Sequence, residues 1–221
     1  MAMTNLIGKE DMREIDGLFR SQLAGEVSVL LFTSKRDRVY CGQTKQLLQE
    51  VASLTDKVKL EVFDIEEERA RAGKMAVDLT PTTVVVASNG AKLYYVGMPA
   101  GRQLRSLVED VVDASRGRAD MDEETRSIIR RVDAETVVKV FVTTFCPYSP
   151  LVVRTAHRFA LENLKIRALM IETAEFPQLA KRYNVVGVPR TVINEDAGFD
   201  GAPAEKAFAE RVLEASTRVA R

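Results

Sequence analysis

The sequence contains the same order of predicted strands and helices twice, and the two copies are related by an offset of 108 residues. The prolines that precede the third strand of each copy, Pro81 and Pro189, are separated by that offset. Strands that alternate with helices predict an α/β fold in which a central mixed sheet is flanked by helices. The expected elements are strand Val27–Phe32, helix Thr44–Leu54 and strand Val58–Asp64, then strand Thr136–Val142, a helix to about Glu162 and strand Ile166–Ile171.

The same offset aligns a four-residue turn motif that follows the first strand of each copy. The motif reads Arg-Val-Tyr-Cys in the first copy and Cys-Pro-Tyr-Ser in the second, so the two cysteines occupy opposite ends of their motifs. The aligned pairs are Arg38 with Cys146, Tyr40 with Tyr148, and Cys41 with Ser149.

The length of 221 residues suits two domains of modest size. A helix with apolar periodicity ends near Arg116, and Gly117 follows it, which is a common signal for a helix C-terminus. We therefore expect two units, residues 1–117 and residues 118–221.

Composition excludes several classes of function. The 32 basic residues equal the 32 acidic residues, so the chain has no overall positive field for nucleic acid. The N-terminus does not read as a secretory signal, and no apolar run approaches the roughly 20 residues that span a bilayer. Two distant cysteines and a single histidine offer no zinc-type cluster. We expect a cytoplasmic protein with no metal, no cofactor, no nucleic-acid partner and no membrane contact.

Cys146 is the candidate nucleophile. We expect it at the end of a buried strand and the start of a helix, where unpaired N–H groups and the helix dipole favour the thiolate. Pro147 suits the first turn of such a helix, and Pro150 stiffens it. The alternative is a small buried hydrophobic residue, the commoner role of a lone cysteine. His157 is too far along the helix to act as a base, and we expect a packing or surface role for it.

The paired prolines suggest a peptide-binding groove. We expect cis bonds at Thr80–Pro81 and Val188–Pro189. The backbone of Val188 would then face the Cys146 turn and could pair with an extended peptide. The alternative is an ordinary trans proline that enters an edge strand. The predicted substrate-binding residues are Pro147, Tyr148, Val188 and Pro189.

The run Cys146-Pro147-Tyr148-Ser149-Pro150, followed by Val153-Arg154-x-Ala156-His157-x-Phe159-Ala160, resembles the second unit of the archaeal protein disulfide oxidoreductases. These glutaredoxin-like proteins are built from tandem thioredoxin-fold units. The resemblance implies two such units, dithiol–disulfide exchange on protein substrates, and reduction by a thioredoxin-reductase-like flavoprotein. It is specific in the second unit and weaker in the first.

The sequence departs from that family in both units. Family members carry Cys-x-x-Cys, but here Ser149 holds the resolving position of the second unit. The first unit is degenerate; its site residues are Arg38, Tyr40, Cys41, Thr80 and Pro81. Neither unit can close its own disulfide, and we expect the two cysteines to be too far apart to pair.

The leading hypothesis is a thiol–disulfide oxidoreductase. Cys146 would attack protein disulfides, Ser149 would donate a hydrogen bond to its thiolate, and an external thiol would release the product. One alternative is a redox-inactive module that binds polypeptides. A second alternative is an iron–sulfur carrier of the monothiol glutaredoxin type.

Overall fold

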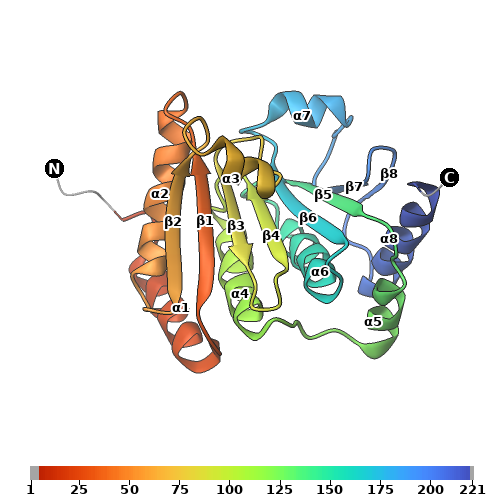
Figure 1. Cartoon of the computed structure of the whole chain (residues 1–221), viewed down its shortest axis with the longest axis horizontal. Helices are drawn as coiled ribbons and strands as arrows, with labels where there is room; N and C mark the ends of the chain where they lie inside the picture. Colours follow the sequence, from red (N-terminus) through yellow and green to blue (C-terminus); the bar gives the residue numbers. More distant parts are fainter. Residues whose placement is uncertain (1–4, 220–221) are drawn as a thin grey trace.

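The computed structural model describes residues 5–219, and its centre is one eight-stranded mixed sheet (Figure 1). The strand order is β2-β1-β3-β4-β6-β5-β7-β8. The strands are β1 (Val27–Thr33), β2 (Val58–Asp64), β3 (Thr82–Val86), β4 (Lys92–Val96), β5 (Thr136–Val142), β6 (Ile166–Glu172), β7 (Arg190–Ile193) and β8 (Ala197–Asp200). The helices are α1 (Lys9–Gln22), α2 (Arg38–Ala52), α3 (Arg69–Lys74), α4 (Arg102–Arg116), α5 (Glu123–Arg130), α6 (Ser149–Glu162), α7 (Pro177–Arg182) and α8 (Glu205–Val219). No helix in this range is long and apolar enough to cross a membrane.

The strand pairing repeats between the two halves of the chain. In the first half, β1 pairs with β2 in parallel and with β3 antiparallel, and β3 continues antiparallel to β4. In the second half, β5, β6, β7 and β8 pair in the same way. The repeat read from the sequence is therefore present in the backbone.

The two halves share one sheet, a feature that the sequence did not predict. Strand β4 pairs in parallel with β6, with Leu93 opposite Ala168 and Tyr95 opposite Met170. All four side chains are buried. Two apolar edge strands avoid exposure to water by pairing with each other, which also satisfies their backbone N–H and C=O groups.

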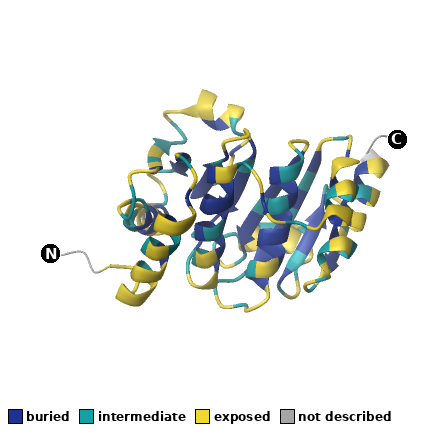
Figure 2. Ribbon diagram, turned by 90° about the horizontal axis from the view of Figure 1, so that it is seen from below, coloured by how far each residue is buried: buried dark blue, intermediate teal, exposed yellow. Residues whose placement is uncertain are grey.

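The two faces of the sheet are covered unequally. Helices α1, α2, α4, α5, α6 and α8 contribute to one continuous apolar core on one face. Among the helices of residues 5–219, only the short α3 and α7 contribute to the smaller clusters on the other face. Figure 2 shows the buried residues concentrated in the strands and on the inner sides of the helices.

Helix α2 begins earlier than the sequence predicted. We expected a helix from Thr44, but it begins at Arg38. The Asp37 side chain accepts a hydrogen bond of 3.2 Å from the Tyr40 N–H and so caps the first turn.

Helix α6 begins just after the Cys146 turn, so the expected place of Pro147 in its first turn is wrong. The helix begins at Ser149, and both residues lie in the turn before it. A helical bond to the Cys146 carbonyl would need the N–H of residue 150, and Pro150 has none. Gly42 occupies the equivalent position in the first half and keeps that donor.

Candidate active site

Cys146 lies beside the backbone of Val188, as predicted. The cysteine is half-buried in the turn between β5 and α6, and its thiol donates to the Val188 carbonyl at 3.5 Å. The Val188–Pro189 bond is cis, as expected. Among the hydrogen bonds of the described residues, the Val188 N–H has no partner. A backbone donor next to the sulfur is therefore open to an incoming chain.

The surroundings of Cys146 favour its charged form. Partial burial raises the pKa of the thiol. Hydrogen bonds from the Ser149 side chain and from the backbone N–H groups of Tyr148 and Ser149 lower it, as does the nearby positive charge of Arg102. The net effect lowers the pKa of Cys146. The Ser149 hydroxyl is fully buried and makes no other hydrogen bond with a described residue, so it is free to donate to the thiolate. The site is thus arranged for a thiolate.

Apolar side chains are exposed around this turn. Phe145 is 86% exposed and Tyr148 65% exposed, and Leu151 is exposed one turn further on. Val186, two residues before Val188, is 96% exposed. We call these four residues the apolar rim. The sequence pointed only to Tyr148 among them, although Phe145 directly before a candidate nucleophile was a readable signal.

The equivalent site in the first half is closed. Cys41 is only 4% exposed, and its sulfur accepts a hydrogen bond of 3.4 Å from the Ser34 N–H. Burial raises the pKa of Cys41, against smaller lowering effects of the Ser34 N–H and the Thr80 side chain. The Thr80–Pro81 bond is cis, as expected. The side chain of Arg38 lies outside the described part of the chain.

The first half contacts the Cys146 turn of the second half. The Arg102 N–H, in the first half, donates to the Thr144 carbonyl at 3.1 Å, two residues before Cys146. A Cβ atom at Gly101 would lie 2.7 Å from that carbonyl oxygen, and the φ angle of Gly101 is positive, so only glycine allows this approach. The first half therefore supports the Cys146 turn directly.

A second contact between the halves involves Glu175. Its carboxylate accepts a hydrogen bond of 2.7 Å from the Met98 N–H in the first half. Burial, together with the nearby Glu172 and Asp37, raises the pKa of Glu175 to about 7 in spite of that bond.

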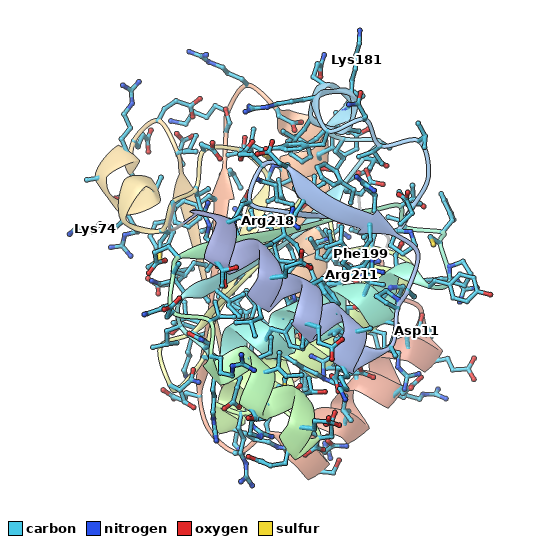
Figure 3. All side chains as sticks on the ribbon, turned by 90° about the vertical axis from the view of Figure 1, so that its right-hand side faces the viewer. Asp11, Lys74, Lys181, Phe199, Arg211 and Arg218 are labelled. Atoms are coloured by element: carbon cyan, nitrogen blue, oxygen red, sulfur yellow. The ribbon has the colours of Figure 1, made fainter. Side chains whose placement is uncertain are left out.

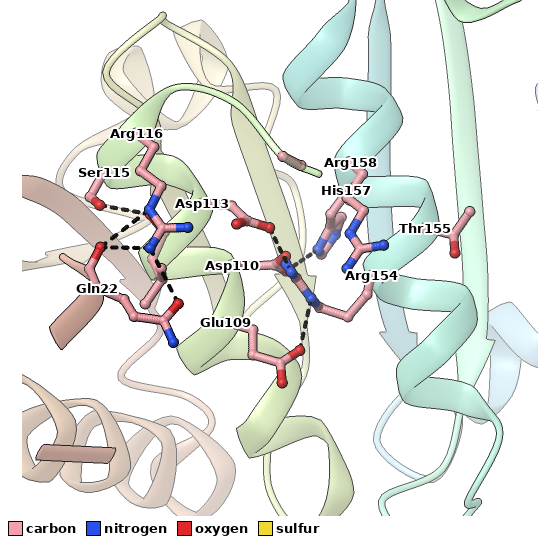
Figure 4. Close-up of polar contacts among 12 residues, drawn as sticks. Gln22, Glu109, Asp110, Asp113, Ser115, Arg116, Arg154, Thr155, His157 and Arg158 are labelled. Carbon is pink, nitrogen blue, oxygen red and sulfur yellow. Dashed lines mark hydrogen bonds and ion pairs between the residues drawn. The ribbon is translucent and has the colours of Figure 1, made fainter. Parts of the chain in front are cut away.

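A buried ionic network joins α4 to α6 (Figure 4). Arg154 pairs with Glu109 at 3.2 Å, with Asp113 at 2.5 Å and with Asp110. Asp110 also accepts from Tyr95 and lies 2.5 Å from His157 Nδ1.

This network was not predicted from the sequence. His157 is not a surface residue but is fully buried, as is Asp110. The available signal was Arg154 and His157 on the apolar face of one predicted helix, with Asp110 and Asp113 inside the apolar stripe of another. In residues 5–219 no group of three His, Cys, Asp or Glu side chains could hold a metal ion.

Comparison with known proteins identifies relatives of both the second half and the whole chain. A family model described as "Thioredoxin domain" matches residues 136–214. A thioredoxin of Methanocaldococcus jannaschii is 33% identical over 76 residues, which cover 34% of this chain and 89% of the relative. The chain spans only 28–32% of the length of curated relatives named as an NADH dehydrogenase or as part of an alkyl hydroperoxide reductase.

Two solved structures match almost the whole chain. A protein disulfide oxidoreductase from Aeropyrum pernix has a TM-score of 0.88 at 26% identity, over 98% of this chain and 96% of that one. The NTD_N/C domain of the alkylhydroperoxide reductase AhpF from Enterococcus faecalis has a TM-score of 0.86 at 23% identity, over 93% of this chain and 99% of that one. These matches confirm the expected tandem thioredoxin fold. The chain belongs to the thioredoxin family.

Proposed function

We propose that the protein is a thiol–disulfide oxidoreductase that acts on protein disulfides through the single nucleophile Cys146. The Cys146 thiolate attacks one sulfur of a substrate disulfide, forms a mixed disulfide and releases the other substrate sulfur as a thiolate. Ser149 occupies the resolving position and contributes a hydroxyl in place of a second thiol. Two external thiols then release Cys146 and the substrate in turn, and they leave as one disulfide.

The observation that carries this proposal is the environment of the Cys146 sulfur. It is half-buried, its pKa is lowered, and the open N–H of Val188 lies next to it. Most structural cysteines are buried and inert, whereas reactive ones are accessible and stabilised as thiolates. Pro147, Tyr148, Val188 and Pro189 form the proposed substrate groove, which the apolar rim extends.

The first half has a supporting role in this proposal. We take residues 1–117 and 118–221 as the two units, with a first site that no longer reacts. The closed position of Cys41 and its raised pKa support this division of labour. The electron source is an external thiol or a reductase. Support for a reductase comes from the partial matches to proteins named NADH dehydrogenase and alkyl hydroperoxide reductase.

The proposal is tested with insulin as the disulfide substrate and glutathione as the external thiol. The protein should reduce insulin only when glutathione is supplied, and Cys146→Ser should abolish the activity while Cys41→Ser leaves it. Ser149→Cys should create an intramolecular disulfide and activity with a dithiol reductant. Insulin reduction that persists in Cys146→Ser would refute the proposal, as would a Ser149→Cys variant in which no disulfide forms.

A second candidate function is binding of unfolded polypeptide without redox turnover. The apolar rim favours it, because such an exposed group beside an open backbone donor suits an extended chain. Binding of reduced, unfolded insulin chains that is equally tight in Cys146→Ser, together with no disulfide reduction, would favour this function.

A further inference from the structure

The face of the sheet opposite α4 and α6 has a divided core. One cluster lies with α3 and the other with α7. Leu169 on β6 packs against both clusters and is itself only half-buried. The two short helices therefore leave the seam between the halves incompletely covered.

A hollow of about 500 Å³ lies at this seam. Strand register sets its floor: Tyr94 lies opposite Leu169, and Val96 lies opposite Ile171. The C-terminal parts of α3 and α7 form its walls, together with the segments that follow them. A hollow of this size accommodates a ligand with an aryl or short acyl body, and an apolar floor favours such a body.

The hollow contains one cation that has no acidic partner among the described residues. Lys139 pairs with Glu195 at 2.9 Å, and Arg182 pairs with the same carboxylate at 3.5 Å. Arg167 forms no ion pair with a described residue. It donates a hydrogen bond of 3.5 Å to the Ala76 carbonyl, and its guanidinium carbon lies 6.0 Å from the centre of the Tyr94 ring.

The guanidinium of Arg167 therefore has unused donors. It is half-buried at the apolar floor, where a charge-assisted hydrogen bond is stronger than in open water. Guanidinium groups match carboxylates in a bidentate geometry. Asp78, the other acid that lines the hollow, is exposed and is not paired with Arg167 in the described structure.

We propose that this hollow, the seam pocket, binds a small amphiphilic carboxylate. The carboxylate pairs with Arg167, and the aryl or acyl body covers the half-buried Leu169. The pocket lies apart from Cys146, and its occupancy does not depend on the proposed redox function.

The test compares naphthalene-2-carboxylate with the neutral naphthalene-2-methanol, using saturation-transfer NMR and calorimetry on the full chain. The carboxylate should bind at least about tenfold more tightly than the alcohol, as expected for a charge-assisted pair. Arg167→Gln should reduce carboxylate binding to the level of the alcohol, and Arg167→Lys should give an intermediate affinity.

Arg211→Gln is the matched control. Arg211 also lies over an aromatic ring, 4.7 Å from the centre of Phe199, beside a second hollow that Asp196 and Glu214 line (Figure 3). This variant should bind the carboxylate as the parent does. Equal affinity for the two probes, or unchanged carboxylate binding in Arg167→Gln, would overturn the proposal. The proposal would also be overturned if neither probe bound. Binding of an acidic peptide instead would not rescue it, because the proposed ligand is a small molecule.

Discussion

Met98 and Glu175 connect the two halves through one hydrogen bond, in which the Met98 N–H donates to the Glu175 carboxylate at 2.7 Å. Glu175 comes from the turn after β6, and Met98 from the loop before α4. The close approach is possible because Gly97 has no side chain: a Cβ there would lie 2.8 Å from the Cβ of Glu172.

Glu175 should make stability depend on pH near neutrality. Its folded pKa of about 7 lies above the ordinary value of 4.5, so the folded state holds a proton that the unfolded state has lost. Stability should therefore fall as pH rises from about 5 to 7 and then level off. Glu175→Gln keeps the Met98 contact and should be more stable by about 1–2 kcal/mol at pH 8, a figure discounted for the partial exposure of the group. Urea unfolding at pH 5 and pH 8 measures both effects. The exposed Glu210→Gln serves as the control, and a parent curve that is flat over this range would contradict the prediction.

The Ser149 hydroxyl should set the reactivity of Cys146. Ser149→Ala removes the donor to the sulfur, so the pKa of Cys146 should rise and alkylation at pH 7 should slow by up to about fivefold, the effect of one hydrogen bond of about 1 kcal/mol. Iodoacetamide labelling followed by mass spectrometry across pH 5–10 checks this. Cys41 should stay unlabelled in the folded protein and acts as the internal control. A pH profile that Ser149→Ala leaves unmoved would show that the hydroxyl has no such effect.

The apolar rim should matter for protein substrates and not for small ones. Tyr148→Ala removes an exposed aromatic contact, so KM for insulin should rise by about five- to thirtyfold, as expected for the loss of an interface contact worth about 1–2 kcal/mol. The rate with a small aromatic disulfide should stay within about twofold. Leu164→Ala, an exposed apolar residue outside the rim, is the control. Equal losses with both substrates would indicate damage to the Cys146 turn instead.

Arg154 should hold the two halves in place. Arg154→Leu leaves Asp110, Asp113 and Glu109 near one another without their cation, and should destabilise the protein by about 3–5 kcal/mol at pH 7. Arg116→Leu is a suitable comparison, because Arg116 joins α4 to the Gln22 carbonyl at the exposed end of α1 (Figure 4). Its loss should cost about 1 kcal/mol or less. Similar unfolding midpoints for the two variants would be evidence against this role of Arg154.

The repeat in the sequence was enough to predict the strands within each half, because strand pairing follows from alternating element order and matching prolines. The position of Cys146 beside Val188 also followed from the aligned motifs. Both are properties of one half considered alone.

Features that depend on contacts between the halves could not be read in this way. The pairing of β4 with β6 depends on two edges that meet in space, and no single segment encodes that choice. The environment of Glu175 likewise needs Met98, which is 77 residues away. The start of α6 was predicted wrongly for a local reason. Pro150 lacks the backbone N–H that Gly42 has at the equivalent position of α2, and the alignment of the two motifs concealed that difference.

The shared sheet also leaves two edge strands, β2 and β8, that bear on whether it can pair with a second molecule. In the repeat, β4 corresponds to β8 and β6 corresponds to β2. The junction in the middle of the sheet therefore pairs the same two types of edge strand that lie unpaired at its outer ends, β8 and β2. A head-to-tail junction of this kind does not close on itself, so repeated pairing of the same two edges between molecules would produce a filament. Here β8 has only four residues and ends in Asp200, and β2 carries the charged Glu61 at the position where β6 has Leu169. The short length of β8 and the charge on β2 therefore disfavour continuation of the sheet beyond two units.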